Sequence, residues 1–188
     1  MSVTSETISQ AAETVGLNAK AVFVHSSLRS FGRVDGGPQA VIDGLLDAGC
    51  TVMVPTFSMI YEVTPPKENR PARNGIDYET YRMDTSNRNL LYTTNSNELN
   101  DNRFSMGAIP KQLLSINGRY RGDHPRGSFA AVGPMAEELI SAQSPFNVYG
   151  PIKKLSEMDG MIALMGVGLK RMTTLHLAEQ ISGRKPFR

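Results

Sequence analysis

The chain has 188 residues, a formal net charge of +2, 40% hydrophobic residues and 20% charged residues. A chain of this length forms about one domain and can bury a sizeable core without disulfides or metals. Its charges form no basic stripe, and no apolar run reaches the roughly 18 residues that a membrane span requires. The N-terminus also lacks the pattern of a secretion signal. We therefore expect a single cytoplasmic domain over residues 1–188, with neither nucleic acid nor a membrane as its partner.

The N-terminal quarter alternates between helical and strand patterns, as in an α/β fold. The predicted elements are, in chain order, a helix over 5–15, a buried strand over 21–25, a polar and glycine-rich loop over 26–37, a helix over 38–48 that begins with proline, and a strand over 51–54. This order predicts the α/β fold class.

A long polar segment over 58–103 interrupts this pattern. It is rich in Asn, Pro, Arg and Thr, and it carries tyrosines at 61, 78, 81 and 92 without a sustained apolar period. A loop of this length inside a domain is usually either a lid over a site or disordered. The tyrosines favour a partly ordered excursion from the domain.

The alternation resumes after the excursion. The predicted elements are a helix over 107–116, a strand over 129–132, a helix over 134–141, a short helix over 151–157, a strand over 161–167 and a final helix that carries His176. Active sites of α/β proteins gather at the carboxyl ends of strands. The segments that follow the predicted strands are therefore the first places to search for function.

The segment over 166–183, GVGLKRMTTLHLAEQISG, reads as a strand end, a glycine-bearing turn and a helix. His176 and Glu179 lie three residues apart, so on a helix they share a face. Thr173 and Thr174 fall where the helix would be capped, and a helix N-terminus offers free N–H groups to negative charge. This helix is the strongest candidate for a site.

A second histidine, His124, lies in the glycine-punctuated segment over 122–133. The following Pro125 favours an extended backbone at His124, which suits a side chain presented at the edge of a loop. His25 ends a predicted buried strand, and we expect it to be hydrogen-bonded there and to hold the next loop. Cys50 starts a strand, so we expect a small core residue and not a nucleophile. Three histidines without paired carboxylates predict no metal site.

The sequence resembles the aminoglycoside 3-N-acetyltransferase family in segments that occur in family order along most of the chain. The segments are VHSSLRSFG (24–32), VDGG (34–37), VPTFS (54–58), SMGAIP (105–110), HPRGSFAAVGPMAEEL (124–139), SPF (144–146) and GVGLKRMTTLHLAE (166–179). The resemblance implies a three-layer α/β/α sandwich with a mixed central sheet. It implies acetyl transfer from acetyl-coenzyme A, without a metal, to an amine, typically the 3-amino group of a 2-deoxystreptamine antibiotic, and hence antibiotic resistance.

The resemblance also assigns roles to residues. It implies that His124 accepts the proton of the amine and that Glu179 orients the ring of His124, with His176 in support. Thr173 and neighbouring N–H groups would stabilise the thioester oxygen. The implied coenzyme-binding residues are Ser26, Ser27, Leu28, Arg29, Ser30, Gly32, Ser105 and Gly107.

Three departures from the family pattern leave alternatives open. Arg121, Gly122 and Asp123 precede the His-Pro pair where the family usually has Arg-Ser, the excursion is longer, and the sequence stops soon after Glu179. The chain is therefore C-terminally short relative to the family. The function is then aminoglycoside acetylation, acetylation of another amino sugar, or binding of coenzyme A or a partner without turnover. The sequence leaves homo-oligomer formation open.

Overall fold

The computed structural model describes residues 2–62, 66–70, 77–80, 90–99 and 105–183, and these residues contain a five-stranded sheet. The strand order is β3-β4-β2-β1-β5. β1 pairs in parallel with β2 and β5, whereas β4 is antiparallel to β2 and β3. The mixed central sheet is confirmed. The strands are β1 (Ala21–Ser26), β2 (Thr51–Pro55), β3 (Tyr120–Arg121), β4 (Phe129–Val132) and β5 (Met161–Met165).

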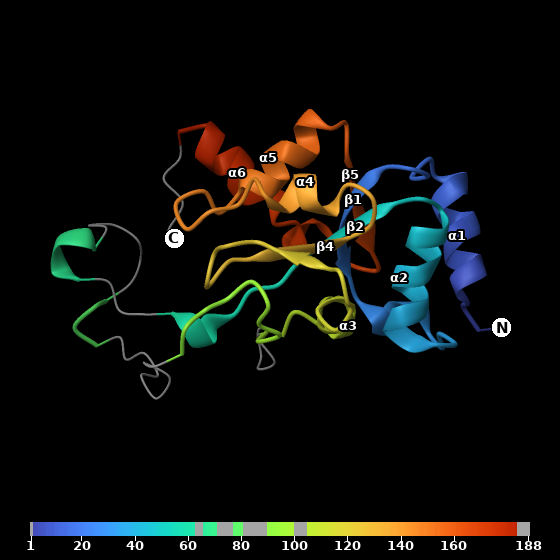
Figure 1. Ribbon diagram of the computed structural model, residues 1–188, viewed down its shortest axis with the longest axis horizontal. Helices are drawn as coiled ribbons and strands as arrows, with labels where there is room; N and C mark the ends of the chain where they lie inside the picture. The colour runs from blue at the N-terminus through green and yellow to red at the C-terminus, as the bar shows by residue number, and fades with distance from the viewer. Residues whose placement is uncertain (1, 63–65, 71–76, 81–89, 100–104, 184–188) are drawn as a thin grey trace.

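Helices cover both faces of the sheet, as Figure 1 shows, which confirms the three-layer α/β/α architecture. One face carries α1 (Ser5–Thr14), α2 (Gly37–Asp47) and α3 (Ala108–Leu113). The other carries α4 (Ala136–Ile140), α5 (Gly150–Glu157) and α6 (Thr174–Ile181). The α/β fold class therefore follows from the alternation seen in the sequence.

β1 separates two apolar clusters because successive side chains of a strand point to opposite faces. Val22 and Val24 pack in the cluster that contains residues of α1, α2 and α3. Ala21 and Phe23 pack in the cluster of α4 and α5. All four side chains are buried, which explains why β1 reads as a continuous apolar run and not as an alternating one.

Local chemistry explains where the first helices begin and how they pack. The side chain of Thr4 accepts a hydrogen bond from the N–H of Thr7 and caps α1. Pro38 lies in the first turn of α2, where the missing N–H costs nothing. Gly44 lets α1 and α2 pack closely, since a Cβ atom there would lie 2.4 Å from the carbonyl oxygen of Ser5.

Several element boundaries differ from the sequence-based expectation by one to three residues, and one strand was not expected. β5 ends at Met165 instead of residue 167 because Gly166 adopts a φ of +73°, which turns the chain. α3 ends at Leu113 instead of residue 116. β3 was not predicted, since its two residues carry no strand pattern.

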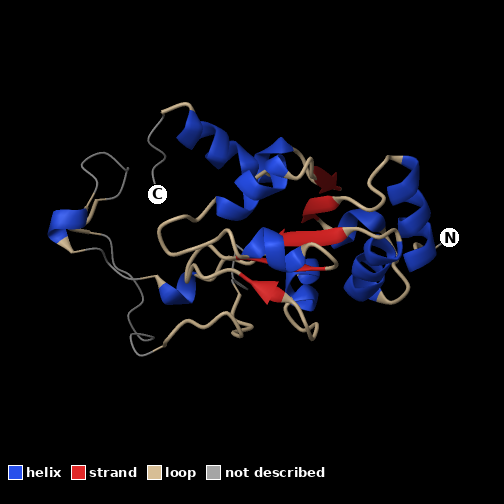
Figure 2. Ribbon diagram, turned by 45° about the horizontal axis from the view of Figure 1, so that its top comes forward, coloured by secondary structure: helices blue, strands red, loops and turns tan. Residues whose placement is uncertain are grey.

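The described part of the 58–103 segment returns to the sheet beside Arg121 and projects away from α1 and α2 (Figures 1 and 2). The ring of Tyr61 packs edge-on against Tyr92, with ring centroids 5.2 Å apart, and the hydroxyl of Tyr92 donates to the carbonyl of Gly122 at 2.6 Å. Tyr78 lies beneath the guanidinium of Arg70. Tyr81 lies outside the described residues.

Arg121 is a buried cation that joins this returning segment to the sheet. Its side chain is only 4% exposed. The guanidinium donates to the carbonyls of Ser96 and Glu98, at 2.6 and 2.8 Å, and to the carbonyl of Thr56 at 3.0 Å. It also donates to the hydroxyls of Ser58 and Ser128. The fork of donors thus holds chain segments that are far apart in the sequence.

We expect Arg121→Met to lower the free energy of unfolding by at least about 3 kcal/mol, because several buried oxygen atoms lose a charged donor. Urea denaturation measures the change. Arg33→Met is the matched control, since the side chain of Arg33 is 84% exposed and should leave the midpoint nearly unchanged. Equal midpoints for the two variants would contradict the anchoring role of Arg121.

Candidate functional site

Three loops meet at one edge of the sheet because of the strand directions. Ser26, at the end of β1, lies opposite Met165, at the end of β5. Pro55, at the end of β2, lies opposite Phe129, at the start of the antiparallel β4. The loops after β1, before β4 and after β5 therefore emerge on the same side, where α/β proteins bind ligands. These loops carry most of the residues that the sequence predicted.

The loop after β1 contacts the turn after β5 directly. The N–H of Ser27 donates to the carbonyl of Met165, and the hydroxyl of Ser30 donates to the carbonyl of Gly166, both at 3.0 Å. A Cβ atom at Gly166 would lie 2.3 Å from the Cβ of Ser30, so only glycine allows this approach. The predicted coenzyme-binding residues over 26–32 therefore lie against the turn that leads into α6.

Ser105 and Gly107 lie at the start of α3, on the layer opposite α6. The hydroxyl of Ser105 accepts a hydrogen bond from the N–H of Gly107 at 3.2 Å. Gly107 has a φ of +91°, which explains a glycine at this helix start. Their assignment to the coenzyme stays a prediction.

His176 and Glu179 form a pair on α6. Nδ1 of His176 and Oε2 of Glu179 lie 3.3 Å apart, and the two side chains are 32% and 36% exposed. When a carboxylate accepts a hydrogen bond from Nδ1–H, the proton of the neutral imidazole is on Nδ1 and Nε2 keeps its lone pair. The pair therefore presents Nε2 of His176 as a proton acceptor.

Tyr149, immediately before α5, supports the ring of His176. The two rings stack with centroids 6.4 Å apart and planes inclined by 25°. Tyr149 is buried, so it offers a fixed surface. Sequence analysis missed this residue because a single tyrosine before a short helix carries no signal of its own.

His124 has the opposite hydrogen-bonding pattern. Its Nδ1 accepts a hydrogen bond from the N–H of Gly127 at 2.8 Å. The proton of the neutral ring then resides on Nε2, which becomes a donor. Burial is the largest cause that lowers the pKa of His124; Arg126 adds to the effect and Asp123 opposes it. His124 is therefore a neutral hydrogen-bond donor at physiological pH.

The structure does not join the two residues that the sequence paired. Within the described residues, the hydrogen bond of His124 is to Gly127, and the carboxylate of Glu179 contacts His176. The orientation of His124 by Glu179 stays a prediction, and Glu179 has a contact with His176 in α6. The physical reason is the helical spacing, which brings positions 176 and 179 onto one face.

Thr173 occupies the N-cap position of α6, as the sequence predicted, but its side chain makes no capping hydrogen bond. Its backbone is helical, with φ −62° and ψ −25°, where a capping residue is normally extended. A short 3₁₀ turn, Leu169–Arg171, leads into it. The N–H groups of Leu175 and His176 in the first turn already donate to the carbonyls of Met172 and Thr173, at 3.2 and 3.0 Å.

Gln143 fixes the turn that carries His124. Its amide nitrogen donates to the carbonyls of Gly127 and Val148, at 3.0 and 2.7 Å, and its amide oxygen accepts from the N–H of Phe129. Gly122 leaves room for it, since a Cβ there would lie 1.8 Å from that oxygen. This support could not be predicted from the sequence, because Gln143 follows a helix as an ordinary polar residue.

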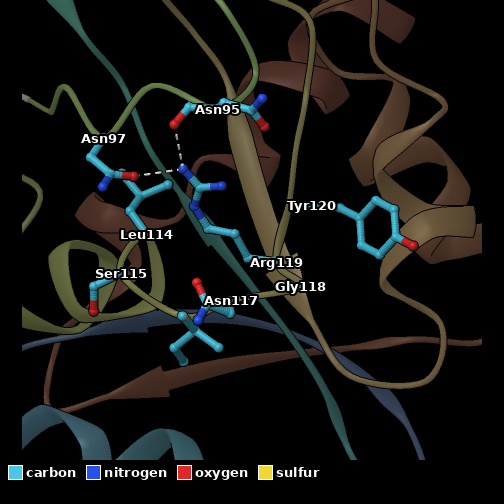
Figure 3. Close-up of a pocket in the computed structure, with 9 residues that line it drawn as sticks. Asn95, Asn97, Leu114, Ser115, Asn117, Gly118, Arg119 and Tyr120 are labelled. Atoms are coloured by element: carbon cyan, nitrogen blue, oxygen red, sulfur yellow. Dashed lines mark hydrogen bonds between the residues drawn. The ribbon is translucent and has the colours of Figure 1, made fainter.

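A polar pocket lies elsewhere, beside the start of β3 (Figure 3). Its volume is about 550 Å³. The guanidinium of Arg119 donates to the carbonyl of Asn95 at 2.9 Å and to the side-chain oxygen of Asn97 at 2.6 Å. The pocket residues lie at the start of β3, up to Tyr120, whereas His124 follows the end of β3 at Arg121. The pocket therefore lies toward the end of the sheet that is opposite the three loops. It contains none of the predicted site residues, so its size does not make it the candidate site.

Three further observations concern metal-binding groups, membrane-spanning helices and Cys50. Within the described ranges, no group of three or more His, Cys, Asp or Glu side chains is placed to hold a metal ion. No helix in that part of the chain is long and apolar enough to cross a membrane. Cys50 is fully buried, its thiol donates to the carbonyl of Leu17, and burial raises its pKa, as suits the predicted core residue.

Comparisons with known proteins agree with this architecture. A sequence model of the family described as aminoglycoside 3-N-acetyltransferase matches residues 23–188. Aminoglycoside N(3)-acetyltransferase IX of Micromonospora chalcea is 30% identical over 167 residues, which cover 86% of this chain and 56% of that protein. The chain thus spans little more than half the length of this relative.

Solved structures show the same fold. The YokD protein from Bacillus subtilis is 26% identical, with a TM-score of 0.75 over 96% of this chain and 67% of that one. A mutant of aminoglycoside acetyltransferase AAC(3)-IVa in complex with apramycin is 27% identical, with a TM-score of 0.65 over 95% of this chain and 62% of that one. Because the family match covers most of its length, this chain belongs to the aminoglycoside 3-N-acetyltransferase family.

Proposed function

We propose that the protein transfers acetyl from acetyl-coenzyme A to an amine of an aminoglycoside, the 3-amino group of 2-deoxystreptamine. The observation that carries the proposal is the His176–Glu179 pair, on the helix whose entry turn touches the loop over 26–32. Family membership supports the reaction, and the apramycin complex of a relative supports the class of acceptor. Such a reaction confers resistance to the antibiotic.

The reaction needs a base because an amine on a cationic sugar is mostly protonated near neutral pH. Nε2 of His176 accepts the proton of the amine, and Glu179 stabilises the imidazolium that forms, as a carboxylate does in hydrolase triads. The amine lone pair then attacks the thioester carbon. A C–N bond forms and the C–S bond breaks, so the sulfur leaves as thiolate. The nitrogen loses its second proton, the thiolate takes up a proton as the coenzyme thiol, and the first proton passes from His176 to solvent.

The thioester oxygen gains negative charge during this attack and needs hydrogen-bond donors. His124 suits this role, because the N–H of Gly127 occupies Nδ1 and leaves Nε2–H as a donor. The hydroxyl of Thr173, which makes no capping hydrogen bond, is a further donor at the start of α6. In this proposal, His124 donates to the acyl oxygen and His176 takes the role of base that the sequence had assigned to His124.

Exposed cations favour an anionic coenzyme at the same edge. Arg29 lies in the loop after β1, and Lys170 and Arg171 lie in the turn after β5. The contact between Ser30 and Gly166 brings these two loops together. Guanidinium and ammonium groups bind phosphate oxygens through charge-assisted hydrogen bonds, so the phosphates of coenzyme A fit this rim.

Exposure of the last helix favours a second candidate function, binding of coenzyme A without turnover. Within α6 no residue is buried apart from Thr173 at its start, and Leu175 and Ile181 are exposed. The catalytic pair is therefore open to water on this side. Acetylation of a simpler amino sugar is the third alternative.

Thiol release from acetyl-coenzyme A separates these functions. We expect release with kanamycin-type and gentamicin-type acceptors at rates well above that of hydrolysis without an acceptor. Turnover with simple amino sugars alone would show that the acceptor is another amino sugar and not an antibiotic. Coenzyme binding by calorimetry, without thiol release for any amine, would favour the binding function.

We expect His176→Ala to lower kcat by about 10²–10⁴-fold while coenzyme A still binds, because the base is lost and the binding loop is not. Glu179→Gln should cause a smaller loss, since the amide oxygen of glutamine can still accept a hydrogen bond from Nδ1 but brings no negative charge to stabilise the imidazolium. Steady-state kinetics measures both effects. Gln180→Ala, on the exposed side of the same helix, is the control. Full activity in His176→Ala would exclude it as the base.

We expect His124→Gln to lower kcat by about 10²–10³-fold at most, the usual value for one oxyanion donor, because glutamine retains an N–H donor. The acid limb of the pH–rate profile should persist in this variant, since the base is His176. The profile of each variant between pH 5 and 9 tests this, with about four points per pH unit. If the acid limb disappears in His124→Gln but persists when His176 is changed, His124 is the base.

A further inference from the structure

The turn that carries His124 is held on both sides by residues of the long polar excursion. Before His124, the carbonyl of Gly122 accepts a hydrogen bond from the hydroxyl of Tyr92 at 2.6 Å. After it, the carbonyl of Arg126 accepts a hydrogen bond from the N–H of Ser58 at 2.9 Å. Each contact lies two residues from His124, so the excursion fixes the backbone on the two sides of this ring.

Aromatic and cationic contacts fix the ring of Tyr92. It packs edge-on against Tyr61, and the guanidinium of Arg121 lies over it, with Cζ 5.4 Å from the ring centroid. The hydroxyl of Tyr61 is itself 2.8 Å from Oγ of Ser96. Burial is the largest cause that raises the pKa of Tyr92, so its phenol stays protonated and remains a donor near neutral pH.

An ion pair adds to the hold after His124. Nε of Arg126 lies 3.1 Å from Oε1 of Glu62, although the direction of the N–H makes no hydrogen bond. The side chain of Glu62 is 20% exposed, so water screens the pair only in part. The next residue, Gly127, donates to Nδ1 of His124 at 2.8 Å. The contacts at Arg126 therefore also place the donor that sets the tautomer of the ring.

His124 needs such support because it lies in the loop between β3 and β4. Loops position functional side chains less precisely than helices and strands do. The role proposed above requires Nε2–H of His124 within hydrogen-bond distance of the acyl oxygen. A misplacement of about 1 Å can lower a rate about 10²-fold. Contacts that hold the loop from outside therefore bear directly on the rate.

We propose that Tyr92 and Glu62 are positioning residues for His124, which hold its turn on both sides and so aim Nε2–H at the acyl oxygen. This inference rests on the proposed function. It gives the excursion a part in the rate that requires no contact with either substrate. Tyr92 acts through the carbonyl of Gly122, and Glu62 acts through Arg126.

Double-mutant cycles test whether the two residues act through His124. We expect Tyr92→Phe and Glu62→Gln each to lower kcat about tenfold, because the donor is misaligned. The KM for acetyl-coenzyme A should stay within about twofold, since the loop over 26–32 is unchanged. In a His124→Ala background each change should have almost no further effect, because the residue that it positions is gone. Steady-state kinetics measures both cycles.

A second measurement does not depend on turnover. Burial is the largest cause that lowers the pKa of His124; Arg126 adds to the effect and Asp123 opposes it. Tyr92→Phe changes none of these charges but loosens the turn, so water reaches the ring and the pKa of His124 should rise toward its usual value. Proton NMR titration of the ring C–H signals measures the pKa. The chain has three histidines, and the spectrum of His124→Ala identifies the signal.

Matched controls remove similar groups elsewhere. Tyr120→Phe deletes a hydroxyl that donates to Glu137, and Glu138→Gln breaks the ion pair with Lys154. Neither change removes a contact of the His124 turn. Both variants should keep kcat and the pKa of His124 unchanged.

The outcomes separate this inference from the proposed function. An unchanged kcat, or a loss that adds fully to that of His124→Ala, would overturn the inference for the residue concerned. A fall of the melting temperature by more than about 5 °C, with an equal loss of coenzyme binding, would show a structural role and would also overturn it. If the unchanged protein releases no thiol, the proposed function fails, and the titration alone decides: an unchanged pKa of His124 in Tyr92→Phe rejects Tyr92 as its support.

Discussion

The parallel register of β1 and β5 is the constraint on which the candidate site depends. It places Ser26 opposite Met165, so the loop over 26–32 and the entry turn of α6 leave the sheet together. Gly166 then allows contact that a side chain would prevent. A shift of one residue would move every side chain of β1 to the other face, and the ring of His25 would leave the side covered by α6.

Backbone and carboxylate partners give the two half-exposed histidines opposite functions. Glu179 holds the Nδ1 proton of His176 and frees Nε2 as an acceptor, whereas Gly127 occupies Nδ1 of His124 and makes Nε2 a donor. A single imidazole cannot present both states at once. The proposed acyl transfer needs one acceptor for the amine proton and one donor for the carbonyl oxygen, and the hydrogen-bonding states of the two rings match these two needs.

Those parts of the fold and of the candidate site that depend on short sequence segments could be predicted from the sequence. The apolar run of β1 and the helical spacing of His176 and Glu179 are properties of short segments, and both appear in the structure. The hydrogen-bond partner of His124 and the unpartnered Nε2 of His25 could not be predicted, because both depend on which atoms the folded chain brings to a ring. Tyr149 and Arg121 belong to the same class, since their roles come from contacts between distant segments.

Exposure to water limits how much Glu179 alone can stabilise an imidazolium at His176. Both side chains are about one-third exposed, and an ion pair in contact with water gains little, because the solvent screens it. Electrostatic stabilisation of an imidazolium rises as water is excluded from the site. In the proposed reaction, a coenzyme and an acceptor bound against α6 would exclude water from the pair and so raise its contribution to the rate. This coupling explains why an open pair on a surface helix is compatible with a catalytic role.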